Sequence, residues 1–200
     1  MGRPKTFEDA EVVAQVMHCF RERGYGATSI RDLEKLTGLK AASLYKAFGN
    51  KASLFCIALD RYTEEVIARR IATHLVADNG LDGIRSFFSS TYRTEPKPTQ
   101  GCLLTNTAIE APVVDGNAHK RVERGLIEIR EAFEAQIESC QDSGEIGLPV
   151  DAASTAQVLI VLYEGLLVLL RSGASVVTFD RVIDTAIDSL FAPATLKKER

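Results

Sequence analysis

The chain has 200 residues, 46% hydrophobic and 26% charged, which excludes a disordered or fibrous protein and allows a core to form without disulfide bonds or structural metals. The net charge is −3, but residues 1–51 hold nine Lys or Arg against six Asp or Glu, whereas residues 52–200 hold fifteen against twenty-one. The excess of positive charge in the N-terminal part indicates a module that faces phosphate groups.

Helical periodicity runs through most of the sequence. The first predicted helix ends near Gly24 and carries apolar residues at the spacing i, i+3, i+4 and i+7, namely Val13, Val16, Met17 and Phe20. The same spacing recurs within residues 122–137, 159–170 and 182–190, and no segment shows the sustained alternation of a strand. Breaks that contain glycine or proline divide the chain further, so we predict an all-α fold of about nine helices.

Two short helices follow the first. The second is predicted to begin at Ser29, because Ser29 and Asp32 have the spacing of a capping box, with Thr28 as an alternative cap. It ends at Thr37-Gly38-Leu39, and a third helix from Lys40 to Phe48 follows after a short turn that contains glycine. Two short helices joined in this way are typical of the DNA-binding helix-turn-helix, whose second helix enters the major groove.

The later helices are predicted to be long and apolar. The fourth runs from about Asn50 to Leu75, which is long enough to connect two sub-domains. The most apolar run, Val158 to Leu170, has 13 residues and includes Glu164. It therefore predicts a buried helix, and we expect no span long enough to cross a bilayer and no membrane partner.

The N-terminal helices resemble the TetR family of transcriptional regulators over about residues 7–60. The resemblance rests on residue types at fixed offsets: Phe20, Gly24-Tyr25, Thr28-Ser29, Leu33, Gly38, Leu44-Tyr45, Phe48, Lys51 and Leu54-Phe55. It implies a helix-turn-helix DNA-binding domain over residues 1–50 and a C-terminal regulatory and dimerisation domain over residues 51–200. The implied protein is a repressor that binds palindromic operator DNA as a homodimer and is released by a small-molecule effector or a thiol-reactive signal.

The resemblance also implies contacts to the DNA backbone. Tyr45, Lys46 and Lys51 lie on or just after the third helix and resemble the family's phosphate contacts, and Thr28 and Ser29 stand at the start of the second helix. Such contacts supply affinity and orientation but do not read the base sequence. The alternative for the lysines is that they only solvate the surface.

The third helix departs from the family where base-reading residues are expected. Lys40 replaces the usual Ser or Thr cap, Ala41 and Ala42 replace polar or glycine residues, and Ala47 replaces the common His or Tyr. Alanine contacts only apolar groups such as the thymine methyl, whereas Lys40 can donate to guanine and Ser43 to either base type. We therefore expect thymines opposite Ala41 and Ala42.

The first residues suggest both a location and a further DNA contact. Residues 1–6 lack the apolar core of a secretory signal, which favours a cytoplasmic protein. Arg3 and Lys5 are similar to the arm that some helix-turn-helix proteins lay in the A·T-rich minor groove. A disordered basic tail is the alternative.

The segment from Gln100 to Glu110 is the most distinctive later one. It is similar to a Gly-Cys-Leu segment in a subset of TetR regulators, which includes repressors that respond to electrophiles through that cysteine. Cys102 lies near a predicted helix N-terminus, where the helix dipole favours the thiolate, and an inert buried thiol is the alternative. The residues expected to line a ligand pocket share a polar or reactive group on an otherwise apolar helix: Tyr92, Cys102, Asn106, Glu110, Tyr163 and Glu164. Hydrogen bonds between helices would explain the polar ones equally well.

Two apolar helices, within residues 151–173 and 179–191, resemble the pair that forms the family's four-helix dimer interface. A dimer suits a palindromic operator whose half-sites are one helical turn, about 34–36 Å, or a multiple of it apart. We expect the signal to shift helices of the C-terminal domain and, through the long fourth helix, the separation of the two DNA-reading heads. A coupling of about 1–3 kcal/mol is enough for this.

Other kinds of chemistry are not indicated. The three histidines are isolated, and the four cysteines form no Cys-x-x-Cys pair, so we expect no metal and no cofactor. The sequence has no Gly-x-Ser-x-Gly elbow, phosphate loop or His-Glu-x-x-His motif, so we expect no enzyme. Two alternatives remain: a small all-helical enzyme that uses Cys102, Glu110 or Glu164, and a DNA-binding protein controlled by a protein partner.

Overall fold

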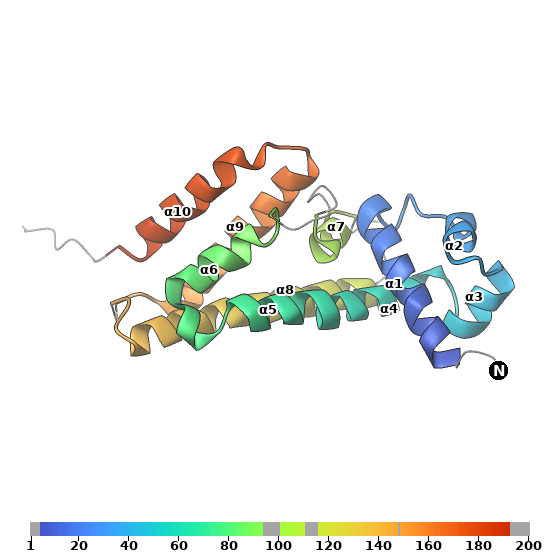
Figure 1. Cartoon of the computed structure of the whole chain (residues 1–200), viewed down its shortest axis with the longest axis horizontal. Coiled ribbons are helices and arrows are strands. Elements are labelled where there is room, and N and C mark those ends of the chain that lie inside the picture. The colour runs from blue at the N-terminus through green and yellow to red at the C-terminus, as the bar shows by residue number, and fades with distance from the viewer. Residues whose placement is uncertain (1–4, 94–100, 111–115, 148, 193–200) are drawn as a thin grey trace, which may run out of the picture. The chain divides into compact units, whose positions relative to one another are not determined.

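A computed structural model describes residues 5–93, 101–110, 116–147 and 149–192. Within these ranges the chain forms helices and turns and no strand, which confirms the all-α prediction (Figure 1). Two 3₁₀ turns, Ala77–Asn79 and Val176–Thr178, lie between helices. The α-helices other than the long fourth one are α1 (Lys5–Arg23), α2 (Ile30–Thr37), α3 (Ala41–Phe48), α6 (Gly80–Ser89), α7 (Leu103–Ile109), α8 (Gly116–Asp142), α9 (Ala152–Arg171) and α10 (Phe179–Leu190).

The predicted long fourth helix consists of three consecutive segments. These are α4 (Lys51–Tyr62), a π-helical segment (Thr63–Ile67) and α5 (Ala68–His74), which continue without a break. Asn50 caps the start, because its Oδ1 accepts the N–H of Ser53 at 2.8 Å. Counted as one, this helix and the eight others make nine in the described ranges, as predicted. The π-helical segment was not indicated by the sequence.

By its packing the chain divides into two compact units. The first unit comprises residues 1–69 and 100–126, and the second comprises residues 70–99 and 127–200. The first therefore holds α1 to α4 and α7, and the second holds α6, α9 and α10. The proposed functional boundary at residue 50 is a different kind of division and stays a prediction.

The core of the first unit forms where the N-terminal helices pack on α4. The ring of Phe20 in α1 meets the ring of Phe55 in α4 edge-on, with 4.8 Å between centroids, and both side chains are buried. Leu33 of α2 and Leu44 of α3 are also buried. Burying each such side chain contributes roughly 1.5–3 kcal/mol, which holds the two short helices in place. The four apolar residues predicted on the core face of α1 are all buried.

The core of the second unit is aromatic. Phe87 and Phe88 of α6, Phe133 of α8 and Tyr163 of α9 have no exposed surface. Their ring centroids lie 5.2–6.1 Å apart in tilted, stacked and edge-on pairs. Aromatic pairs of this kind contribute about 0.5–1.5 kcal/mol beyond the area they bury, so α6, α8 and α9 are firmly joined.

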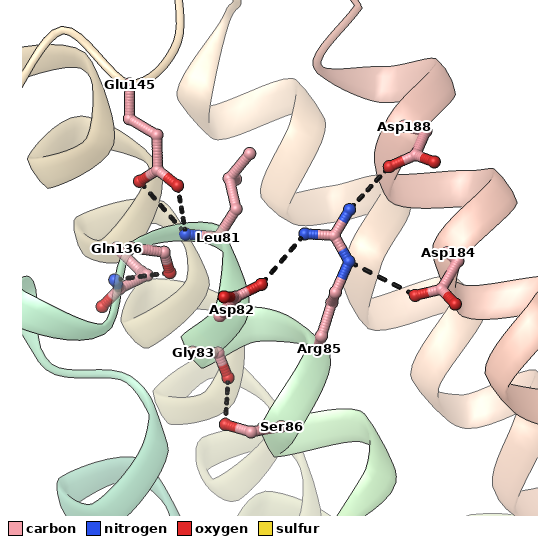
Figure 2. Close-up of polar contacts among 10 residues, drawn as sticks. Leu81, Asp82, Gly83, Arg85, Ser86, Gln136, Glu145, Asp184 and Asp188 are labelled. Carbon is pink, nitrogen blue, oxygen red and sulfur yellow. Dashed lines mark hydrogen bonds and ion pairs between the residues drawn. The ribbon is translucent and has the colours of Figure 1, made fainter.

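Polar contacts also join α6 to α10 in the second unit (Figure 2). The guanidinium of Arg85 binds three carboxylates, with nitrogen–oxygen distances of 3.4 Å to Asp82, 3.3 Å to Asp184 and 2.6 Å to Asp188. Glu145, which follows α8, accepts the N–H of Leu81 in the first turn of α6 at 3.2 Å. One end of α6 is thus held by Glu145 and one side of it by α10.

The helix α9 corrects one expectation. It has 20 residues and, among the described residues, is the one helix long and apolar enough to cross a membrane by length and composition. The apolar run counted from the sequence began at Val158, whereas the helix begins at Ala152. The N-cap residue Asp151 comes just before it, and its carboxylate accepts the Ser154 N–H at 3.2 Å. Core helices of soluble proteins pass the same test, and Tyr163 and Leu167 of α9 are buried in the second unit.

Candidate nucleic-acid interface and regulatory residues

The start of α2 is built as the sequence predicted. Ser29 and Asp32 form a complete capping box, with the Asp32 N–H donating to Ser29 Oγ at 3.2 Å and the Ser29 N–H donating to Asp32 Oδ2 at 2.9 Å. The hydrogen bond from the Ser29 side chain is the main reason that the pKa of Asp32 lies below its usual value. Ser29 remains exposed at the helix N-terminus, where a phosphate can approach.

Thr28 is placed differently from the prediction. Its side chain is buried, and its Oγ1 donates a hydrogen bond to the Gly24 carbonyl at 2.7 Å. The hydroxyl therefore closes the turn between α1 and α2 and does not face solvent. This placement argues against the predicted phosphate contact through the Thr28 side chain.

The helix α3 buries Leu44 and turns most of its other side chains outward. Lys40, Ala42, Ser43 and Lys46 are exposed, Tyr45 is 45% exposed, and Ala41 is half-buried. The exposed surface is therefore apolar at Ala42 and Tyr45 and polar or basic at Lys40, Ser43 and Lys46. A helix with one buried anchor and such a solvent face can enter a major groove, and the predicted base and phosphate contacts of these residues stay predictions.

The cap of α3 comes from a residue that the sequence did not single out. Lys40 occupies the N-cap position but makes no side-chain capping hydrogen bond. Instead, the Ala41 N–H donates to Oε1 of Glu34 in α2, at 2.7 Å. Glu34 is seven positions away and belongs to another helix, so capping spacing gave no signal for it. Its carboxylate fixes the geometry of the two helices across the turn.

Lys51 lies against the turn that follows α1. Its Nζ donates to the Tyr25 carbonyl at 2.6 Å and lies 4.1 Å from the centroid of the Tyr25 ring. Partial burial lowers the pKa of Lys51. The ammonium group is thus committed in part to holding the turn, and its predicted phosphate contact stays a prediction. Arg3 lies outside the described residues, as does the side chain of Lys5.

Three of the predicted ligand residues lie on or beside α7 in the first unit. Cys102 is the N-cap residue of α7 and is only 2% exposed. Asn106 Nδ2 donates to the Arg21 carbonyl at 3.0 Å, and Glu110 Oε2 accepts the Gly26 N–H at 2.9 Å. Asn106 and Glu110 thus make hydrogen bonds to other segments, as in the alternative considered from the sequence, and their predicted ligand contacts stay predictions.

The other predicted ligand residues lie in the second unit. The Tyr163 hydroxyl accepts a hydrogen bond from Arg70 Nη1 at 2.8 Å. The Tyr92 hydroxyl donates to Asp180 of α10, and burial, followed by that carboxylate, raises the pKa of Tyr92. Both tyrosines are buried, whereas Glu164 is half-buried on α9.

Arg70 links the core of the second unit to polar groups and was not singled out by the sequence. Besides Tyr163, its guanidinium donates to Ser90 Oγ at 2.9 Å and to the Phe87 carbonyl at 2.8 Å, and it lies 4.3 Å from the centroid of the Phe87 ring. Burial, and then the charge of Arg70, lowers the pKa of His74. In sequence this arginine looks like any other in a charged helix.

The described residues contain no group of three or more His, Cys, Asp or Glu placed to hold a metal ion. The four cysteines are free thiols, and all are buried.

An open groove of about 360 Å³ lies beside α1 and α4, with Asp9, Asp60 and Glu64 in its wall. None of the six residues predicted to bind a ligand lines this groove.

Two family models and several regulators are similar to this chain. Residues 13–56 match the family model of bacterial regulatory proteins, tetR family, and residues 80–186 match that of the tetracyclin repressor-like, C-terminal domain. The chain is 26% identical over 189 residues to the HTH-type transcriptional repressor ComR of Escherichia coli (strain K12). The aligned region covers 93% of this chain and 90% of ComR. It is 30% identical over 162 residues to the uncharacterized HTH-type transcriptional regulator YezE of Bacillus subtilis (strain 168), covering 80% of this chain and 84% of YezE.

A solved structure with the same fold contains DNA. The TetR family transcriptional regulator CifR, as a cysteine mutant complexed with 26-bp double-strand operator DNA, superposes with a TM-score of 0.79. The similarity covers 94% of this chain and 99% of that chain, at 22% sequence identity.

Proposed function

Because this chain belongs to the TetR family of bacterial transcriptional regulators, we propose that it represses transcription by binding palindromic operator DNA as a homodimer and that a small-molecule or thiol-reactive signal releases it. The observation that carries this proposal is the solvent face of α3, held in place by the buried Leu44 and by the Glu34 cap. The similar proteins are named as transcriptional regulators, so the proposed function includes no catalytic step.

On DNA, α3 lies in the major groove and α2 lies above the backbone. Tyr45 and Lys46 contact phosphates together with the N-terminal end of α2, and Ala42 faces a thymine methyl. The DNA-binding domain covers residues 1–50 and the regulatory and dimerisation domain covers residues 51–200. The neighbour that was solved with operator DNA supports this arrangement at the level of the fold.

The second copy in the dimer covers an apolar stripe on α9. The stripe consists of exposed residues at helical spacing: Val158, Val161, Gly165, Val168 and Leu169. Val161 is 64% exposed and Leu169 is 51% exposed in the single chain, which is costly for two large apolar side chains on one face. Gly165 in the middle lets a second helix approach closely, and a two-fold axis there pairs the stripe with itself.

The signal acts on buried groups. Cys102 is covered by its own unit, so a reagent that adds bulk to its Sγ displaces the start of α7. Tyr92, Tyr163 and Glu164 are the proposed contacts of a small-molecule effector. Because both tyrosine hydroxyls already have hydrogen-bond partners, such a ligand must replace those bonds when it binds.

Selection of binding sites from a random duplex library tests the DNA-binding part of the proposal. Purified, reduced protein at one stated salt concentration is expected to recover a palindrome whose half-sites are about one helical turn, or a multiple of it, apart. Recovery of no motif, or binding that depends on salt and not on sequence, would count against an operator-binding repressor.

A second experiment tests the thiol signal. N-ethylmaleimide is expected to release the wild-type protein from the selected operator and to leave Cys102→Ser bound. Release of Cys102→Ser to the same extent would move the reactive thiol elsewhere, and retention of the wild-type protein after complete alkylation of Cys102 would contradict a thiol switch.

A further inference from the structure

Polar contacts within the first unit tie α7 to the end of α1 and to the turn that follows it. Arg21 Nε donates to the Gly101 carbonyl at 2.7 Å, just before α7 begins. Asn106 Nδ2 donates back to the Arg21 carbonyl at 3.0 Å, so that arginine is bound at both its side chain and its backbone. Four residues further on, Glu110 Oε2 accepts the Gly26 N–H at 2.9 Å. Asn106 and Glu110 lie on one side of α7, and this side faces the end of α1 and the turn.

The Glu110 carboxylate is packed directly against the turn. A Cβ added to Gly24 would lie 1.8 Å from Glu110 Oε1, and Gly24 also has a φ of +85°. The first value rules out any side chain at Gly24 while Glu110 keeps its position, and the second favours glycine independently. The glycine that ends α1 therefore serves two needs: the left-handed backbone and the close approach of α7.

The same turn is held from α4. Lys51 donates to the Tyr25 carbonyl, and the Tyr25 ring lies 4.8 Å from the ring of Phe55, centroid to centroid. The charge of Glu110 favours the charged form of Lys51, so the carboxylate and the ammonium group attract each other across the turn. The turn between α1 and α2 is thus fixed by Lys51 through a carbonyl and by Glu110 through an N–H.

From this turn the chain leads at once into the DNA-binding helix pair. Gly26 is three residues before Ser29, the N-cap of α2, and the Thr28 hydroxyl is bound to the Gly24 carbonyl. The Gly26 N–H is therefore only three residues from the N-cap of α2, and the hydrogen bond of Thr28 restrains the chain between them.

We propose that Glu110 is a latch that couples α7 to the helix-turn-helix. While its carboxylate accepts the Gly26 N–H, the turn and α2 are held in the position that binds DNA, and displacement of α7 withdraws the carboxylate and frees them. The latch deepens the proposed function and rests on it, since α7 is also the helix that begins at Cys102.

The test compares Glu110→Ala, Glu110→Gln and the control Glu123→Ala, which removes an exposed carboxylate from α8 in the same unit. Hydrogen–deuterium exchange of residues 24–29 and affinity for the selected operator are measured on each full-length protein. Glu110→Ala is expected to exchange faster in this segment and to bind the operator roughly 5- to 150-fold more weakly, with its unfolding temperature shifted by no more than a few degrees. Glu110→Gln keeps a neutral acceptor and should recover part of both losses.

The latch is overturned if residues 24–29 of Glu110→Ala exchange at the wild-type rate. It is also overturned if they exchange faster but the affinity for the operator is unchanged. A loss of affinity that Glu123→Ala reproduces also overturns it, because the effect would then be one of net charge. Failure of the wild-type protein to select any operator overturns the proposed function and the coupling to DNA together. If the wild type selects an operator and Glu110→Ala binds it with equal affinity, only the latch is overturned.

Discussion

At the scale of single residues, several polar side chains of the helix-turn-helix satisfy backbone groups. Ser29 and Asp32 cap α2, Glu34 caps α3, and Asn50 caps α4. Each cap satisfies an N–H that has no partner within its own helix. Among the residues predicted to contact DNA, Thr28 and Lys51 also serve the turn, whereas the exposed residues of α3 remain available to a partner.

The Glu34 cap gives the first prediction. Glu34→Ala is expected to lower the free energy of unfolding by about 0.5–2 kcal/mol, because the Ala41 N–H loses its carboxylate partner. Urea unfolding measures the change. Lys35→Ala, at an exposed position of the same helix, is the control, and Lys40→Ser in the Glu34→Ala background should restore part of the stability by supplying a hydroxyl cap. Equal stability of Glu34→Ala and the wild type would contradict this role.

The environment of His74 gives a prediction about pH. Burial and the charge of Arg70 lower its pKa below the usual 6.5, so the folded chain binds this proton less readily than the unfolded chain does. The free energy of unfolding should therefore fall as the pH is lowered through and below about 6.5. His74→Gln is expected to reduce that fall, and the exposed His18→Gln is expected to leave it unchanged. Identical pH slopes for all three proteins would exclude a contribution from His74.

At the scale of elements, the helices differ in what holds them. α6 is bound to α8 and α9 by aromatic rings and to α10 by carboxylates around Arg85. The rings are buried, but Asp184 and Asp188 are 57% and 70% exposed, so water and salt screen those ion pairs. The contact of α10 with α6 is therefore the more sensitive to ionic strength.

Arg85→Met tests this difference. The variant is expected to lose about 1 kcal/mol of stability at low salt and less at about 0.5 M salt, and to exchange amide protons faster in α10. Arg181→Met, on the exposed surface of α10, is the matched control. A loss that does not depend on salt would mean that the Arg85 stem acts through packing and not through its charge.

At the scale of the whole molecule, the apolar stripe on α9 is a surface of the described residues that a single chain leaves exposed. Its residues are exposed although the opposite side of the same helix is buried around Tyr163. A helix that is apolar all round is usually buried all round. The length and apolar composition of α9 that resemble those of a membrane span also suit a helix that packs on its own core with one side and on a second copy with the other, as proposed.

The double variant Val161→Lys/Leu169→Lys is expected to sediment as a monomer and to lose operator affinity, because two buried charges per copy would oppose the proposed interface. Ile57→Lys, which changes an exposed apolar residue of α4, should behave as the wild type in sedimentation. A double variant that still sediments as a dimer would place the interface elsewhere, and a wild-type monomer at micromolar concentration would contradict the dimer itself.

The helices and the helix-turn-helix could be predicted from local patterns in the sequence. Periodic apolar residues, the capping box at Ser29 and the glycine after α1 act over a few residues, so they can be read without knowing what lies nearby in space. For the same reason the core residues of α1 were predictable. The helix predicted within residues 151–173 is α9, Ala152–Arg171, but the expectation that no span could cross a bilayer was wrong, because only the apolar run from Val158 was counted.

The contacts of the polar side chains depend instead on how distant helices pack. Gly26 and Glu110 are 84 residues apart, and Arg70 and Tyr163 are 93 apart, so no local pattern records that they meet. The same residue types are compatible with a ligand pocket and with an interhelical hydrogen bond. The choice depends on which backbone N–H or carbonyl the packing of distant helices brings within about 3 Å, because hydrogen bonds act only at that range.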